Sequence, residues 1–318
     1  MRHRFAAFVV LTSASALFQL VACGDKTSEP NDFPTSPMPD GKAKPDPDPE
    51  RDADPGIDNA LPEPSTEGRV YAHTTRKLFL YEPINNVLTE IGTFSCLDPT
   101  SSLDYIIDLA VDRTGTMYAT TLDRFLKVDP ITAKCDELGI ADIDLDYPNA
   151  LSFVPAGTVD PTKEALVGYA SDFNAFNAVI YVQIDTTNGK MTRKGNMNAS
   201  DAGPQYRASG DFVSIIADSN RTYATVKLKT DGGTGTDLLA QINPANGQVI
   251  KIIGDTKQND LWGVGYWAGK GYGFSANGRI IQIDMSTGLG VVVSEPKTDA
   301  GGILPWYGAG STTQAPLN

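Results

Sequence analysis

The sequence predicts an all-β fold, a five-bladed β-propeller whose first blade is completed by the C-terminal strand. One observation behind this prediction is a strand pattern that recurs about every 50 residues from residue 69 onward. A second is that the complete repeats hold four strands, which is typical of propeller blades. A third is that the first repeat lacks one strand, while one unmatched strand follows the last repeat.

A short strand that ends in tyrosine and a small residue marks each repeat. The five tyrosines are Tyr71, Tyr118, Tyr169, Tyr223 and Tyr272, and they lie 47, 51, 54 and 49 residues apart. A second strand follows each of them, with the sequences LFLYEP, FLKVDP, YVQIDT, LAQINP and IIQIDM. Tight turns come next, as at 187–189, 245–247 and 286–288, where Asn or Gly tolerates positive φ. A third strand then closes the repeat, as in VLTEIG, CDELG and VIKIIG.

Four repeats also begin with an additional strand, which we place at the propeller axis. These strands are IIDLAVD (106–112), NALSFVP (149–155), FVSIIAD (212–218) and LWGVGYW (261–267). The first repeat has no such strand before Val70, but LPWYGAGS (304–311) has the same pattern and no strand follows it. Pairing of this segment with the first blade would close the ring and remove exposed sheet edges. A six-bladed ring and an open sandwich remain as alternatives.

The first 22 residues, 1–22, are expected to form a bacterial lipoprotein signal peptide. A basic start, MRHR, precedes an apolar run from Phe5 to Leu20 that is short for a membrane-spanning helix. The tetrapeptide Leu20-Val21-Ala22-Cys23 resembles the lipobox of lipoprotein signal peptidase. This resemblance implies cleavage before Cys23 and lipidation of that cysteine. The alternative is an ordinary signal peptide, which would leave Cys23 as a free thiol.

Residues 23–68 are predicted to be a lipid-anchored, disordered linker that precedes the propeller domain at 69–318. From Gly24 to Gly68 the chain has ten prolines and twelve acids but only four basic residues, and such a segment buries too little apolar surface to fold. Removal of the signal peptide takes away two arginines, so the net charge changes from −13 to −15. This charge disfavours nucleic acid and anionic head groups as partners, and membrane attachment is therefore assigned to the acylated Cys23.

The two remaining cysteines, Cys96 and Cys135, are predicted to form a disulfide, which would persist in the oxidising space outside the cytoplasm. The strand assignment leaves a tension, because Cys96 follows one outer strand and Cys135 begins the next, and a disulfide needs close Cα atoms. Two buried free thiols are the alternative. A zinc site is not expected, because His73 is the only histidine in the predicted domain.

The lipobox, the acidic Pro-rich linker, the blade segments IIDLAVDRTGTMYATT and NALSFVPAG, and the closing WYGAGSTTQAP together resemble predicted β-propeller lipoproteins of myxobacteria and related Gram-negative bacteria. The resemblance covers nearly the whole chain and implies the same fold and location. It implies no enzymatic activity, because none is assigned to that group.

Four carboxylates near the predicted inner strands are the candidates for catalysis. They are Asp104, Asp108, Asp211 and Asp260. Five-bladed glycosidases use axial carboxylates as acid, base or nucleophile, with the pair about 5–10 Å apart. The alternative is that these aspartates form turns at strand ends. His73 lies within a predicted strand, where a structural role is expected rather than that of a catalytic base.

A run of alternating acids, Asp142, Asp144 and Asp146, has the oxygen ligands that calcium prefers. An EF-hand would need glycine after the third acid and glutamate at the twelfth position, where this chain has Tyr147 and Phe153. The run is therefore expected to face solvent, and no metal site is predicted.

Aromatic residues gather in the last repeat and in the closing strand. Trp262, Tyr266 and Trp267 belong to the first, and Trp306 and Tyr307 to the second. We expect them to pack between blades, with strict alternation placing Trp262 and Tyr266 on one face. The alternative is a patch on which a sugar stacks.

Together these features predict a non-enzymatic, lipid-anchored envelope protein, monomeric, that presents a propeller binding surface to a protein or glycan. No cofactor is expected. Gly24 rather than aspartate follows Cys23, which favours the outer membrane. The alternative function is a glycosidase-like propeller hydrolase that uses the axial carboxylates.

Overall fold

The computed structural model describes residues 69–141, 145–171, 179–200, 203–231 and 234–318. The chain divides into two units, Met1–Ala60 and Leu61–Asn318, and all of the described residues belong to the second unit. The predicted signal peptide, Cys23 and the linker lie outside the described residues. The description below concerns the second unit alone.

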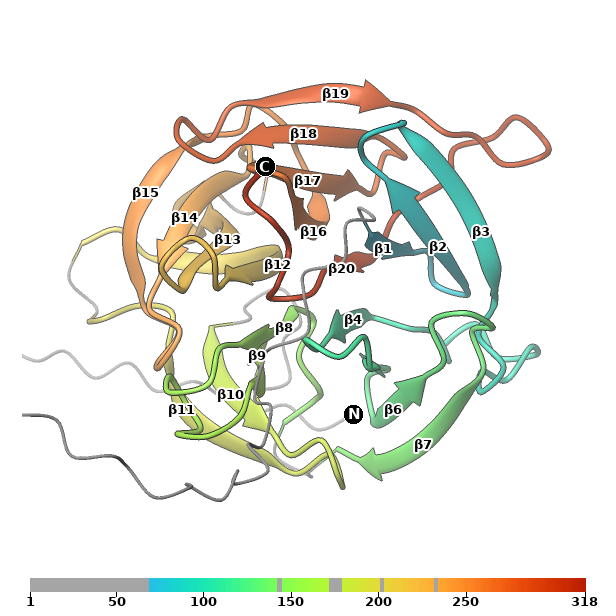
Figure 1. The fold of residues 1–318 in the computed structure, drawn as a ribbon, viewed down its shortest axis with the longest axis horizontal. Helices are drawn as coiled ribbons and strands as arrows, with labels where there is room; N and C mark the ends of the chain where they lie inside the picture. The colour runs from blue at the N-terminus through green and yellow to red at the C-terminus, as the bar shows by residue number, and fades with distance from the viewer. Residues whose placement is uncertain (1–68, 142–144, 172–178, 201–202, 232–233) are drawn as a thin grey trace, which may run out of the picture. The chain divides into compact units, whose positions relative to one another are not determined.

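Five antiparallel sheets of four strands each stand in a ring around one axis (Figure 1). Blade 1 has, from the axis outward, β20 (Gly308–Gly310), β1 (Val70–His73), β2 (Lys77–Glu82) and β3 (Val87–Thr93). Blade 2 has β4 (Asp108–Val111), β5 (Met117–Thr120), β6 (Arg124–Val128) and β7 (Cys135–Ile140). Blade 3 has β8 (Leu151–Val154), β9 (Ala165–Ala170), β10 (Ile180–Ile184) and β11 (Met191–Asn196).

Blade 4 has β12 (Tyr206–Ile215), β13 (Arg221–Leu228), β14 (Leu238–Ile242) and β15 (Val249–Asp255). Blade 5 has β16 (Leu261–Trp267), β17 (Lys270–Ser275), β18 (Ile280–Asp284) and β19 (Gly290–Ser294). A 3-10 turn, η2 (Lys229–Asp231), follows β13. The all-β prediction with five blades is confirmed, and the six-bladed ring and the open sandwich are wrong.

The C-terminal strand closes the ring, as predicted. β20 pairs antiparallel with β1, with Ala309 opposite Ala72. The strand is shorter than the predicted segment 304–311. Trp306, before the strand, donates its backbone N–H to Ser275 in blade 5 at 3.4 Å rather than to a strand of blade 1. Tyr307 donates its N–H to the carbonyl of His73 at the end of β1 at 2.9 Å, and regular pairing begins at Gly308.

Glycines near the ends of three outer strands receive the hairpin of the next blade. A Cβ at Gly254 in β15 would lie 1.9 Å from the backbone oxygen of Thr287, in the turn between β18 and β19. Gly139 and Gly195 meet the hairpins of blades 3 and 4 in the same way, each with a carbonyl oxygen 2.1 Å from the ideal Cβ position. Only a residue without a side chain fits there, because the obstacle is backbone.

Buried aromatic rings fill the spaces between blades. Trp306 is fully buried and meets Phe79 and Phe274 edge to face, at centroid distances of 5.3 and 5.5 Å. Tyr266 and Trp267 are also in the core. The predicted packing of these three residues between blades is confirmed, and removing one such ring typically costs about 3–5 kcal/mol of stability.

The predicted disulfide is confirmed. Cys96 and Cys135 are bonded, with their Cα atoms 5.5 Å apart. Cys96 follows β3 and Cys135 opens β7, so the bond joins the outer edges of blades 1 and 2. The segment after β3 carries Cys96 across to blade 2, where Ser95 accepts a hydrogen bond from the Cys135 backbone N–H at 3.1 Å. Because this segment crosses to blade 2, the two cysteines are close enough to bond, although one follows β3 and the other begins β7.

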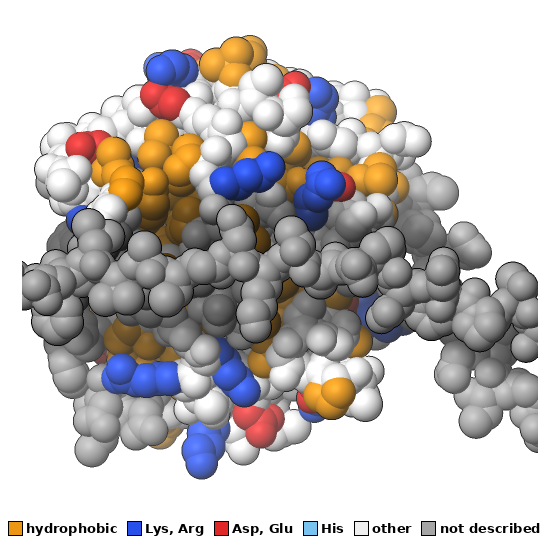
Figure 2. Space-filling view, turned by 90° about the vertical axis from the view of Figure 1, so that its left-hand side faces the viewer, with side chains coloured by type: hydrophobic (Ala, Val, Ile, Leu, Met, Phe, Trp, Pro, Cys, Tyr) orange, Lys and Arg blue, Asp and Glu red, His pale blue; other side chains and the backbone are white. Residues whose placement is uncertain are grey.

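The outer surface mixes side chains of different kinds. On the side shown in Figure 2, Lys and Arg side chains are scattered among hydrophobic, acidic and uncharged ones. Ile140 and Ile250, on the outer strands of blades 2 and 4, are 71% and 57% exposed. In the described part of the chain no helix has the length and apolar character needed to cross a membrane.

Candidate functional site

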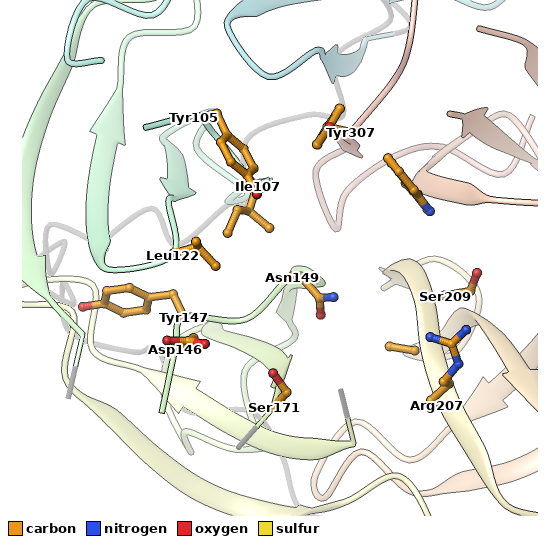
Figure 3. A pocket seen from close by; sticks show the side chains of 12 residues that line it. Tyr105, Ile107, Leu122, Asp146, Tyr147, Asn149, Ser171, Arg207, Ser209 and Tyr307 are labelled. Atoms are coloured by element: carbon orange, nitrogen blue, oxygen red, sulfur yellow. The ribbon is translucent and has the colours of Figure 1, made fainter. Parts of the chain in front are cut away.

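A pocket of about 300 Å³ lies at one end of the propeller axis (Figure 3). Segments from all five blades line it, because it sits where the inner strands begin. Blade 2 contributes Tyr105, Ile107 and Leu122, and blade 3 contributes Asp146, Tyr147, Asn149 and Ser171. Blade 4 contributes Arg207, Ala208 and Ser209, blade 5 contributes Trp262, and blade 1 contributes Tyr307.

Three aromatic side chains form one wall of the pocket. Tyr307 lies between Tyr105 and Trp262, with ring centroids 5.8 and 5.1 Å away and an interplanar angle of 71° in both contacts. The edges and faces of these rings therefore form a continuous apolar surface that reaches from blade 2 through blade 1 to blade 5.

The expected alternation in the last repeat is wrong at Trp262. The pairing of β16 with β17 shifts between Leu261 and Gly263, which leaves Trp262 as the extra residue of a β-bulge. Val264 and Tyr266 remain in the core, whereas Trp262 turns into the pocket. A bulge re-aims a side chain in this way because it interrupts the two-residue period of the strand.

The rest of the lining is mixed, with apolar Ile107, Leu122 and Ala208, charged Asp146 and Arg207, and uncharged polar side chains. Asn149, Ser171 and Ser209 supply an amide and two hydroxyls to the pocket (Figure 3). The phenol of Tyr147 is already engaged, because it donates to the carbonyl of Gly189 at 3.0 Å. An apolar wall with a few hydrogen-bonding groups around it is typical of small-molecule sites.

Ser209 is connected to a buried carboxylate behind the pocket wall. Its hydroxyl donates to Asp237, which is fully buried and also accepts the backbone N–H of Leu261 at 2.8 Å. The ammonium of Lys227 lies 3.9 Å from Asp237 and 2.8 Å from Asp260. Burial raises the pKa of Asp237 to about 6, although the hydrogen bonds from Leu261 and Ser209 and the charge of Lys227 act in the opposite direction.

Two carboxyls, Asp108 and Asp211, lie on inner strands near the axis, and both are fully buried. Asp108 begins β4, and Asp211 lies within β12. Asp108 accepts the backbone N–H groups of Leu109 at 2.7 Å and of Leu151 in β8. Asp211 accepts those of Val264 in β16 at 3.2 Å and Ala309 in β20 at 2.8 Å. Since Asp108 is on β4 and Asp211 on β12, this axial pair touches the inner strands of all five blades.

The two carboxyls of the axial pair affect each other's ionisation. Burial and the charge of Asp108 raise the pKa of Asp211 well above its usual range, so Asp211 holds its proton more tightly than an exposed aspartate does. The Oδ1 atom of Asp211 is buried and has no hydrogen-bond partner among the described residues. Burial also raises the pKa of Asp108, while its contacts with His73 and Asp211 lower it. His73 lies with its Nε2 atom 3.9 Å from Asp108, and its Nδ1 atom is 2.9 Å from the carbonyl of Thr74.

The structure separates the four predicted catalytic candidates. It brings Asp108 and Asp211 together, but as a buried pair rather than as groups that project into the pocket. Asp104 forms an ion pair with Arg124, and Asp260 forms one with Lys227. These four residues therefore do not make a single site.

Of the acidic run considered for calcium, Asp142 and Asp144 lie outside the described residues, and Asp146 lines the pocket. Among the residues that the structure describes, no group of three or more His, Cys, Asp or Glu side chains is arranged to hold a metal ion. The sequence had not marked Asn149, Ser171, Ser209 or Asp237. Asn149 begins the repeated strand at 149–155, but the repeat predicts the fold there, and no motif singled out these four side chains.

Fold and site together define a five-bladed β-propeller with an axial pocket. No family model matches the chain, and no curated protein matches it. The resemblance to propeller lipoproteins of myxobacteria therefore stays a prediction beyond its fold.

Solved structures that are weakly similar to this chain include the following three proteins. A protein of unknown function from Bacteroides caccae is 8% identical, with 76% of this chain and 77% of that one covered and a TM-score of 0.36. The PQQ-bound aldose sugar dehydrogenase from Streptomyces coelicolor is 13% identical, with 80% and 84% covered and a TM-score of 0.42. An oligogalacturonate lyase in complex with manganese is 12% identical, with 74% and 84% covered and a TM-score of 0.33. Likenesses this weak carry no argument about function.

Proposed function

We propose that this protein is a non-enzymatic, lipid-anchored envelope protein whose propeller binds a saccharide in the axial pocket. The observation that carries the proposal is the aromatic wall of Tyr105, Tyr307 and Trp262, with hydrogen-bonding side chains around it. A sugar ring has apolar C–H faces and a rim of hydroxyls. Aromatic rings can pack against the faces, while amides and hydroxyls satisfy the rim.

The burial of the axial pair favours binding over hydrolysis. A glycosidase needs two carboxyls about 5–10 Å apart with the scissile bond between them. Asp108 and Asp211 instead have no exposed surface and accept backbone N–H groups of the inner strands. A propeller hydrolase that uses axial carboxylates remains the alternative function, and the same experiment distinguishes it.

The test is a glycan array probed with the full mature protein, followed by titration calorimetry with the best saccharide. Trp262→Ala should weaken binding at least about tenfold, equivalent to about 1.4 kcal/mol. The control is Ile131→Ala, because Ile131 is 80% exposed and lies outside the pocket. Equal affinities of the two variants would refute the pocket as the binding site. A change in the mass of the bound saccharide on incubation would instead support the hydrolase.

The location is proposed from the sequence alone, since residues 1–22 and Cys23 lie outside the described residues. The proposal is that Cys23 is acylated and holds a monomeric protein at the outer membrane. Cys23→Ser should then leave an uncleaved precursor that fails to incorporate labelled fatty acid and loses its preference for the detergent phase. Normal cleavage with unchanged partitioning would refute lipidation.

A further inference from the structure

Ser209 differs from the other hydroxyls of the pocket because its proton is committed to a group behind the wall. Its hydroxyl lines the pocket and donates to Asp237. The same carboxylate accepts the N–H of Leu261, which fixes the carboxylate plane. A hydroxyl has one donor and two acceptor positions. While Asp237 is ionised, Ser209 can therefore offer the pocket only acceptors.

We propose, resting on the function proposed above, that Asp237 is a positioning residue that sets the hydrogen-bonding polarity of Ser209. When Asp237 is ionised, Ser209 accepts a hydrogen bond from the ligand. When Asp237 is protonated, it donates to Ser209, and the Ser209 proton turns into the pocket.

The surroundings of Asp237 place its change between the ionised and protonated forms near pH 6. The carboxylate has no exposed surface, and the charged groups near it are Lys227 from β13 and Asp260 from the segment before β16. The Lys227 ammonium lies closer to Asp260 than to Asp237, so it forms its stronger ion pair with Asp260. Burial is the largest influence on Asp237 and raises its pKa to about 6.

The consequence is a preference among saccharides. A sugar hydroxyl can donate or accept, so a neutral sugar adapts to either state of Ser209. An amino sugar carries an ammonium that only donates, so it suits ionised Asp237. A uronic acid carries a carboxylate that only accepts, so it suits protonated Asp237. At neutral pH Ser209 therefore suits a donor and not a carboxylate. Arg207 and Asp146 also line the pocket, and their charges are present in the wild type and in Asp237→Asn alike, so the effect of Asp237 is measured by how affinity changes with pH in each.

The experiment uses the full mature protein with methyl glucoside, methyl glucosaminide and methyl glucuronide between pH 5 and 7. Binding is followed by the indole resonance of Trp262. Glucuronide affinity should fall about threefold to tenfold as the pH rises through about 6, glucosaminide affinity should rise by a similar factor, and the glucoside should change little. In Asp237→Asn the amide nitrogen faces Ser209 and donates permanently, so all three affinities should keep their low-pH ratio. The exposed Asp231→Asn is the control.

A ligand-free measurement separates this inference from the saccharide function. The Cβ resonance of Ser209 should titrate with the same midpoint as the carboxyl carbon of Asp237, and Asp237→Asn should abolish that titration. If none of the sugars moves the Trp262 signal but Ser209 still follows Asp237, the saccharide function is wrong and the switch stands. A Ser209 resonance that ignores pH, or charged sugars bound equally by wild type and Asp237→Asn at both ends of the range, would overturn the inference.

Discussion

Replacing Asp211 by asparagine should remove a pH dependence of stability that the axial pair creates. In the wild type, one oxygen of Asp211 accepts two backbone N–H groups, from Val264 and Ala309, and the other is buried without a hydrogen-bond partner, while the charge of Asp108 raises the pKa of Asp211. An asparagine amide keeps these two hydrogen bonds, because its oxygen can accept both N–H groups. The variant makes the same contacts without having to hold a proton.

The sign of the effect follows from the raised pKa of Asp211. An aspartate in an unfolded chain has a pKa of about 3.9, whereas burial and the charge of Asp108 raise the pKa of Asp211 well above this in the folded protein. The stabilisation from the bound proton is therefore complete below about pH 3.9 and is lost as the pH rises through the folded pKa. Between these limits the wild type should lose about 1.4 kcal/mol per pH unit relative to Asp211→Asn.

The assay is urea unfolding of both proteins from pH 4 to pH 8, with the difference in unfolding free energy plotted against pH. The exposed Asp231→Asn is the matched control and should shift that difference by a constant. A second variant, Asp211→Ala, leaves the Asp108 carboxyl buried without its partner and should cost about 3–5 kcal/mol. A difference curve between wild type and Asp211→Asn that is flat over the whole range would show that the pKa of Asp211 is not raised in the folded protein.

Three further predictions concern the contacts that hold the ring. Deleting residues 304–318 removes β20 and the buried Trp306 ring, so calorimetry should show a melting temperature lower by about 10 °C or more, and an unchanged value would mean that closure is not needed. Gly254→Ala places a Cβ against the backbone of Thr287 and should lower the unfolding free energy by about 1–3 kcal/mol in urea, whereas a neutral effect would show that the hairpin can move aside. Reducing the Cys96–Cys135 bond should add two hydrogens by mass and cost about 2–5 kcal/mol, and free thiols in the unreduced, unfolded protein would contradict the bond.

The repeat made the fold predictable, because the same strands and turns recur along the chain at a nearly constant spacing. The tyrosine strands locate the second strand of every blade, and the three-stranded first repeat left one place for the closing strand. The length of that strand was not predictable from apolar pattern alone. Its start depends on which blade the Trp306 backbone N–H bonds to, and that is a tertiary contact.

The site was only partly predictable, for two physical reasons. Asp108 and Asp211 stood among the candidates, but a sequence does not show whether the start of an inner strand faces the pocket or the core. Trp262 was assigned to the core because strict alternation hides a bulge. Ser209 lies within a second irregularity, where the pairing of β12 with β13 shifts between Ala208 and Phe212. The apolar pattern predicted this inner strand only at 212–218, whereas β12 spans Tyr206–Ile215 and so includes Ser209.

The axial pair also bears on how this ring could change its size in evolution. Propellers are repeat architectures, and duplication of one repeat is the simplest route to an extra blade. Here a sixth inner strand would widen the axis and disturb the backbone N–H groups that Asp108 and Asp211 accept from β8, β16 and β20. A buried carboxyl that loses its hydrogen bonds costs several kcal/mol. The two buried carboxyls therefore favour a ring of five blades, and a six-bladed descendant would first need other residues at positions 108 and 211.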